Sequence, residues 1–155
     1  MSDLPRPAFI KGIKTEDSDQ GFDEELLEAW IDSCGSALND LESTVVELDS
    51  GINDAGQDAE ARRVIHTIKG EAGILSYSVI QKVCHECESL IDVCANQEKK
   101  FPANEVLEVV DWVRSCIAVL MEDAKASFPD STQLLKILME KNQIPAGTSV
   151  EESQD

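Results

Sequence analysis

RRVIHTIKGEAGILSYSVIQKVCHECESLID, residues 62–92, decides which fold this chain can adopt. Its apolar residues recur every three or four positions, which is the period of a helix with one face on a core. The pattern breaks once, at the short polar segment around residues 76–78. The stretch therefore predicts two consecutive helices, about 58–75 and 79–97. Their apolar stripes are Ala61, Ile65, Ile68, Ala72 and Leu75, followed by Ile80, Val83, Cys84, Cys87, Leu90, Ile91 and Cys94.

The same period continues on both sides of this stretch. It predicts a long helix over about 23–49, ended by Gly51, another over about 105–127, stopped by Phe128-Pro129, and a short one over about 131–142. Short loops between long amphipathic helices are typical of an antiparallel up-down-up-down bundle. The predicted fold is thus all-α, a four-helix bundle with a short fifth C-terminal helix. The outer stripes are Leu27, Trp30, Ile31, Cys34, Leu38, Leu41, Val45 and Leu48, then Val106, Leu107, Val110, Val113, Ile117, Leu120 and Met121.

Helix starts are predicted from residues that can bond the free N–H groups of a first turn. Asp23 is the expected N-cap of the first helix, and Ser78 with Gln81 has capping-box spacing at the third. Asn104 is expected to cap the fourth helix, and Asp130 or Ser131 the fifth. Trp30 and Trp112 are interpreted as packing residues.

Length and charge limit the number of domains and the classes of partner. The chain has 155 residues, 31 acidic against 13 basic, and a net charge of −18. We expect one domain over residues 22–142, a lead-in over 1–21 and a loose acidic tail over 143–155. The charge argues against binding nucleic acid, because the phosphate backbone would be repelled. No apolar stretch approaches the roughly 20 residues of a membrane span, and no export signal is visible, so we expect a cytoplasmic protein. We expect a monomer because four helices can close a core alone.

Five cysteines occur without an export signal, which favours reduced thiols over disulfides. Cys84, Cys87 and Cys94 have the spacing of a buried seam, and we interpret them as packed thiols. A weaker alternative is a metal-binding bundle that uses Cys84, Cys87 and His85.

A second set of residues shares another face of the predicted 58–75 helix. His66, Lys69, Gly70 and Gly73 stand at i, i+3, i+4 and i+7, offset from the apolar stripe. A glycine inside a helix costs about 1 kcal/mol relative to alanine. Two of them on one face favour a surface that another backbone or a phosphoryl group approaches closely. The alternative is a surface histidine, a solvated lysine and glycines that serve helix packing.

HTIKGEAG, residues 66–73, resembles the signature of histidine-containing phosphotransfer (HPt) domains, which have a His-x-x-Lys-Gly core on the second helix of a four-helix bundle. It is most similar to the N-terminal phosphotransfer domain of chemotaxis-type (CheA-like) histidine kinases. That variant has a His-x-x-Glu pair on the next helix, and His85 to Glu88 supplies it here. The specific motif covers about 62–92, and the fold of the family implies likeness over about 22–142.

The resemblance implies a role for each matching residue. His66 corresponds to the phosphorylated histidine and Lys69 to the lysine that offsets phosphate charge. Glu88 falls where the family has a glutamate bonded to the imidazole, and His85 where a second histidine joins that network. Expected docking residues are Arg63, Gly70 and Gly73. One departure is Glu71, where the pattern usually has a small residue, so that negative charge is added near the reaction centre.

The implied function is a phosphorelay step of two-component signal transduction. His66 would accept a phosphoryl group from a histidine kinase domain and pass it to an aspartate of a response-regulator receiver. Imidazole suits this because much of it is neutral and nucleophilic near pH 7, and a carboxylate on one ring nitrogen leaves the other free to attack. The alternative is a non-catalytic helical interaction module that binds a receiver or kinase without carrying phosphate.

The chain lacks a Gly-rich loop followed by Lys-Ser/Thr, so we expect no ATP site of its own. No cofactor and no metal are expected in this chain, and magnesium is expected from the partner. The sequence fits either a free-standing carrier or the N-terminal part of a longer histidine kinase.

Overall fold

The computed structural model describes residues 24–51 and 56–143 of the chain. The helices are α1 (Glu24–Asp49), α2 (Gln57–Ile74), α3 (Ser78–Asn96), α4 (Ala103–Glu122) and α5 (Thr132–Asn142). The described residues contain no strand. The all-α prediction is confirmed. Asp23, the lead-in and the tail from residue 144 lie outside the described residues.

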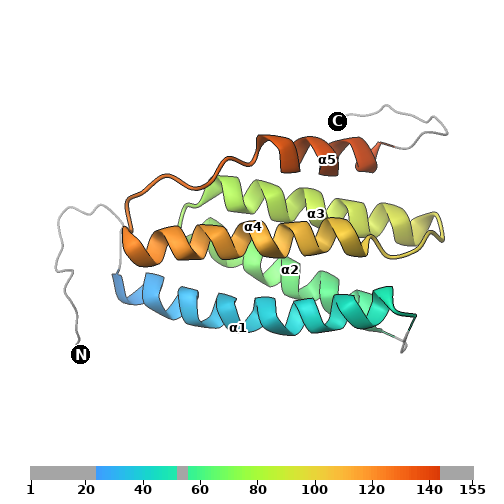
Figure 1. The fold of residues 1–155 in the computed structure, drawn as a ribbon, viewed down its shortest axis with the longest axis horizontal. Helices are drawn as coiled ribbons and strands as arrows, with labels where there is room; N and C mark the ends of the chain where they lie inside the picture. The colour runs from blue at the N-terminus through green and yellow to red at the C-terminus, as the bar shows by residue number, and fades with distance from the viewer. Residues whose placement is uncertain (1–23, 52–55, 144–155) are drawn as a thin grey trace.

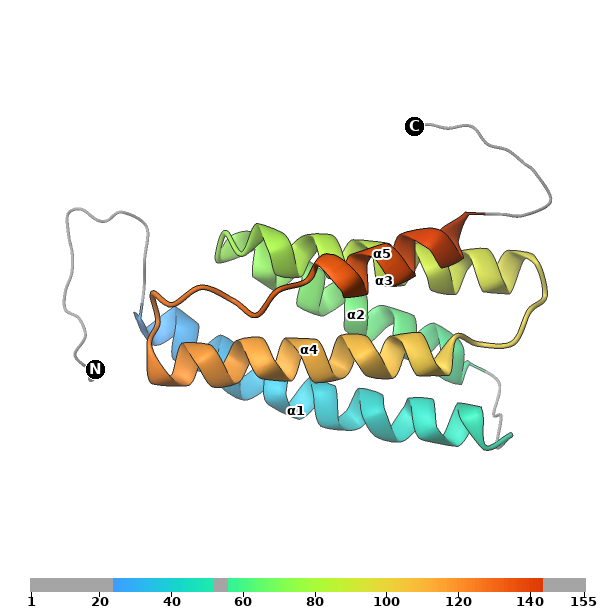
Figure 2. The same cartoon turned by 45° about the horizontal axis from the view of Figure 1, so that its top comes forward.

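Helices α1 to α4 run alternately up and down and form a closed four-helix bundle (Figure 1). α1 packs against α2 and α4, and α3 completes the ring by packing against the same two helices. α5 lies on the outer side of α3, with a smaller contact to α4 (Figure 2). The bundle with one added helix is therefore the fold that the amphipathic pattern predicts.

The core contains the predicted stripes and additional residues that the stripes left out. The additional buried residues are Val64, Ala103, Val109, Cys116, Leu134 and Leu138. All predicted inward residues of α3 are buried, and in the other helices the exceptions are few. Ile31, Leu75 and Leu107 are partly buried against the core. Met121 is exposed to 70 %, so its predicted inward position is wrong. It lies in the last turn of α4, where Leu120 takes the buried place. Trp30 and Trp112 are both buried, as expected.

Helices α2 and α3 end in the same kind of hydrogen-bonded turn, which the sequence pattern does not predict. In both, the N–H three residues past the last helical residue donates to the carbonyl five positions earlier, from Tyr77 to Ala72 and from Lys99 to Cys94, each at 2.8 Å. These are Schellman motifs, which require a left-handed residue that is usually glycine. Here Ser76 (φ 66°) and Glu98 (φ 56°) take that position.

Two predicted caps are corrected by the structure, and the position of a third is confirmed. Tyr77 is the N-cap of α3 because its carbonyl accepts the first helical bond, from the Gln81 N–H, so Ser78 is already helical. Pro102 likewise precedes α4 and accepts from Val106, which puts Asn104 inside the helix. Ser131 is the N-cap of α5, as one prediction had it, but its side chain makes no capping bond.

α4 ends at Glu122, five residues before the predicted end. Asp123 is extended, and its carboxylate accepts the Lys125 N–H at 3.0 Å. An aspartate that bonds nearby backbone offers the chain an alternative to the helix. The linker to α5 is then held by Trp112, whose indole N–H donates to the Pro129 carbonyl at 3.2 Å.

Candidate functional site

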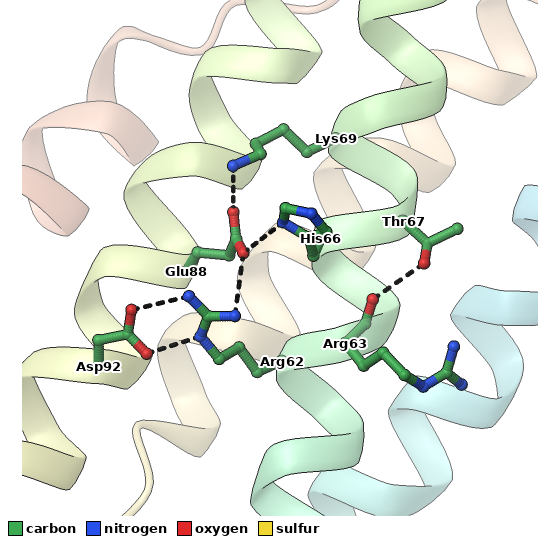
Figure 3. Close-up of polar contacts among 7 residues, drawn as sticks. All are labelled: Arg62, Arg63, His66, Thr67, Lys69, Glu88 and Asp92. Carbon is green, nitrogen blue, oxygen red and sulfur yellow. Dashed lines mark hydrogen bonds and ion pairs between the residues drawn. The ribbon is translucent and has the colours of Figure 1, made fainter.

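The candidate site lies where the middle of α2 faces the middle of α3 (Figure 3). His66 projects from α2, and 62 % of its side chain is exposed. Its neighbours one turn away on the same side of α2 are Arg62 and Lys69. The helical spacing predicted from the sequence therefore places the imidazole at the surface of the bundle and not in its core.

Glu88 is the α3 residue that receives these α2 side chains. It is the only buried charged residue among those the structure describes, with 5 % of its side chain exposed. Its Oε2 lies 2.8 Å from His66 Nδ1, and its Oε1 lies 2.5 Å from Lys69 Nζ. The predicted contact between Glu88 and an exposed imidazole is confirmed.

The electrostatics of Glu88 determine which ring nitrogen is free. Burial raises the pKa of the Glu88 carboxyl, but hydrogen bonds from Lys69 and His66 outweigh it and lower the pKa below the ordinary value of 4.5. Glu88 is therefore ionised at neutral pH and can only accept hydrogen bonds. His66 Nδ1 must then carry the proton, and in the neutral ring Nε2 holds the lone pair.

Lys69 is less free than the sequence suggested. Its side chain is 22 % exposed, and its ammonium is bound to Glu88. In the structure it therefore neutralises the carboxylate that orients the imidazole. An ammonium has three donors, so this contact leaves two for other acceptors.

Arg62 and Asp92 belong to the cluster, and neither was among the residues predicted for the site. Arg62 Nη1 lies 3.4 Å from Glu88 Oε2. Its Nε and Nη2 donate to Asp92 at 2.6 and 2.9 Å, a bidentate pair that lowers the pKa of the Asp92 carboxyl. The signal was available, because Arg62 precedes His66 by four residues and Asp92 follows Glu88 by four, which places each pair on one helix face.

Two predicted site residues lie apart from this cluster. Arg63 pairs with Glu60 on its own helix, at 2.6 Å, and points away from Glu88 (Figure 3). His85 is exposed on α3, and no hydrogen bond or ion pair within 24–51 and 56–143 joins it to Glu88 or His66. The structure brings His66, Lys69 and Glu88 together but leaves His85 outside the network.

The glycines differ in what surrounds them. A Cβ on Gly70 would meet no atom within 4 Å, so this glycine has no packing reason inside the described chain. A Cβ on Gly73 would lie 2.7 Å from Gln81 Nε2, which is the end of an α3 side chain. The end of the Gln81 side chain can shift at little cost, so this contact is only a weak packing reason for Gly73, and Gly70 has no packing reason at all.

Glu71 does not lie on the His66 face. Its charge is close enough to Cys34 on α1 to help burial raise the pKa of that thiol to about 12. The negative charge of Glu71 thus acts on Cys34 of α1, and no hydrogen bond or ion pair within the described ranges joins it to His66.

The cysteines are free and buried, which confirms the packed-thiol interpretation. Burial raises the pKa of Cys84 and Cys87, while His85 lies exposed on the same helix. No three metal-binding side chains come together anywhere in the described ranges. The alternative metal site of Cys84, Cys87 and His85 therefore has no support from the geometry.

Comparisons with known proteins place this geometry in context. The model of the Hpt domain family matches residues 25–137. The chain is also similar to the Chemotaxis protein CheA of Rhizobium meliloti (strain 1021), with 29 % identity over 86 residues, which is 56 % of this chain and 11 % of that protein. The chain thus matches about a tenth of this relative's length. No solved structure matches the chain. Among the described residues, none of the helices has the length and apolar character needed to cross a membrane.

Proposed function

The chain belongs to the Hpt domain family, whose work is histidine phosphotransfer in two-component signalling, and from that premise we propose that His66 is its phosphorylated residue. The observation that carries the proposal is the state of the ring. The imidazole is 62 % exposed, its Nδ1 is held by an ionised Glu88, and no hydrogen bond within the described ranges engages Nε2.

The proposed reaction uses Nε2 as the nucleophile. Its lone pair forms the N–P bond while the bond from phosphorus to the donor's leaving atom breaks, and the leaving electron pair stays on the donor. The ring becomes positively charged and keeps its Nδ1 proton. Glu88 stabilises that charge through the existing 2.8 Å contact, so little rearrangement is needed during transfer.

Lys69 is the proposed charge partner of the phosphoryl oxygens. It lies one turn from His66 and binds Glu88 in the unphosphorylated chain, and in this proposal its ammonium turns from Glu88 toward the phosphoryl oxygens. Phosphoryl transfer depends mainly on positioning and charge neutralisation. The chain supplies the nucleophile and one cation, and magnesium with its acidic ligands belongs to the partner in this proposal.

The proposed partners are a histidine kinase domain as donor and a response-regulator receiver as acceptor. Gly70 supports docking near His66, because its exposed backbone has open space where a side chain would stand. The receiver aspartate would displace Nε2 from phosphorus and form an acyl phosphate. A phosphocarrier fits the cluster better than a docking module without phosphate, because docking alone does not need a buried carboxylate on the imidazole.

The test measures phosphoryl transfer to the chain's two histidines separately. Purified protein is incubated with a CheA-type kinase core and γ-labelled ATP, and in parallel with phosphoramidate as a kinase-free donor. We expect label on wild type and on His85→Gln, none on His66→Gln, and an N–P signal on Nε2 in the ³¹P spectrum. Label on His66→Gln equal to wild type would refute the assignment. A receiver that binds tightly while no donor labels His66 would favour the docking module.

A further inference from the structure

Glu88 has one more cationic neighbour than the phosphotransfer chemistry requires. Its Oε2 is shared between His66 Nδ1 at 2.8 Å and Arg62 Nη1 at 3.4 Å, while Oε1 binds Lys69. The cations approach from positions on either side of His66 along α2 (Figure 3). With Lys69 in place, Arg62 is the weaker partner, because its contact is longer.

The countercharge of Glu88 changes when Lys69 binds the phosphoryl group. A carboxylate with 5 % of its side chain exposed is costly without a countercharge. If Lys69 turns toward phosphoryl oxygens, Glu88 loses its nearest cation. Without another, the carboxyl would tend to take up a proton and could no longer accept the Nδ1 hydrogen bond as an anion.

Arg62 is anchored in a way that Lys69 is not. Two of its nitrogens bind the Asp92 carboxylate as a fork, at 2.6 and 2.9 Å. Such bidentate pairs fix orientation as well as charge. The Asp92 fork holds the guanidinium beside Glu88 by contacts that do not involve Lys69, and a guanidinium does not lose its proton in proteins.

We propose that Arg62 is a positioning residue that keeps Glu88 ionised and bonded to His66 Nδ1 when Lys69 leaves for the phosphoryl group. Arg62 does not touch the reacting atoms. It acts through Glu88, and Asp92 acts through Arg62. The part that concerns Lys69 leaving rests on the proposed function, whereas the counter-ion role can be measured in unphosphorylated protein.

The decisive experiment removes Lys69 and asks what then holds Glu88. The Glu88 Cδ resonance is titrated by ¹³C NMR in Lys69→Gln, which imitates the departed lysine, and in Lys69→Gln/Arg62→Gln. We expect the pKa of Glu88 to be higher in the double variant than in Lys69→Gln, and the His66 ¹⁵N spectrum to lose its Nδ1–H preference. Equal pKa values and equal tautomer populations in the two proteins would overturn the proposal.

Arg114→Gln in the Lys69→Gln background is the matched control. Arg114 also pairs with a carboxylate, Glu42 at 2.8 Å, but it lies on α4. Removing it changes the net charge equally, so a similar shift of Glu88 in this variant would attribute the effect to overall charge and would also overturn the proposal. Arg62→Lys in the same background keeps the charge and loses the fork, so we expect it to restore part of the shift.

A second measurement connects the proposal to transfer. With Lys69 present, we expect Arg62→Gln to take up label about three- to fivefold more slowly than wild type, the size of a partly exposed ion pair. A rate equal to wild type would overturn the transfer role. If wild type itself takes up no label, the proposed function fails, and the titration still decides whether Arg62 holds Glu88.

Discussion

At the scale of single residues, Glu88 is a buried carboxylate that remains charged because α2 surrounds it with donors. Burial alone would raise its pKa, and the hydrogen bonds from Lys69 and His66 reverse the direction. The same bonds fix the imidazole, so the residue that stabilises the α2–α3 contact also orients the ring of the proposed nucleophile. Stability and chemistry are therefore coupled through one side chain.

This coupling predicts a pH-dependent contribution of Glu88 to stability. Because its folded pKa lies below the ordinary 4.5, its contribution is present above that value and is lost as the pH falls through the folded pKa. We expect Glu88→Gln to lower the free energy of unfolding by about 1 to 3 kcal/mol at neutral pH. The difference between variant and wild type should shrink in acid.

Urea unfolding of both proteins between neutral pH and about pH 3 measures this difference. Because wild type and variant are compared at the same pH, the contributions of other carboxylates, Asp92 among them, cancel in the difference of their unfolding free energies. A difference that stays constant or grows in acid would contradict the prediction.

At the scale of elements, α2 has an apolar stripe in the core and a second face that carries no side chain at Gly70. Gly70 has neither a packing neighbour nor a positive φ that would require glycine. Helix propensity alone would therefore favour alanine at this position. The remaining reason for glycine is an approach from outside, next to His66.

Gly70→Ala should separate these two effects. We expect the free energy of unfolding to rise by about 0.5 to 1 kcal/mol, because alanine restricts the unfolded chain and favours the helix. Phosphoryl transfer to a receiver should become slower, because the methyl group occupies the proposed docking face. Urea unfolding and the decay of labelled protein on mixing with receiver measure the two quantities.

Gly35→Ala on α1 is the matched control for Gly70→Ala. A Cβ there also meets nothing within 4 Å, and the position is on another helix. It should stabilise the protein similarly and leave transfer unchanged. If both variants slow transfer equally, the effect is one of stability and the docking interpretation of Gly70 is wrong.

At the scale of the whole molecule, the closed ring of four helices leaves its thiols inside. All five cysteines are buried. Burial raises the pKa of Cys34 and of Cys116 to about 12, so their thiolates are scarce near neutral pH. The same bundle closure that excludes the thiols from solvent leaves His66 on the outer wall.

Reaction with a disulfide reagent such as dithionitrobenzoate at about pH 8 tests this closure. We expect slow reaction in the native protein, with Cys94 first because 9 % of it is exposed, and five fast equivalents in guanidinium chloride. Cys94→Ser should abolish the earliest native phase. Two or more thiols that react at once in the native protein would contradict the buried seam.

Periodicity is a local property of the chain, so it predicted the helices and their core stripes. It also predicted the α2 face that His66, Lys69 and Gly70 share. The pair of His66 with Glu88 could be predicted only through resemblance to a family, since spacing does not say which α3 residue lies opposite. Glu71 illustrates the limit, because it follows Gly70 directly in the sequence and yet its charge acts on Cys34 of α1.

Tertiary structure decided the helix ends and the cluster's full membership. Ser76 and Glu98 take left-handed positions without glycine, in the hydrogen-bonded turns that end α2 and α3. Membership of the cluster depends on which side chains face each other across the α2–α3 contact. That contact includes Arg62 and Asp92 and leaves His85 outside. A single helix carries its own period in its sequence, but the register between two helices depends on how all of them pack at once.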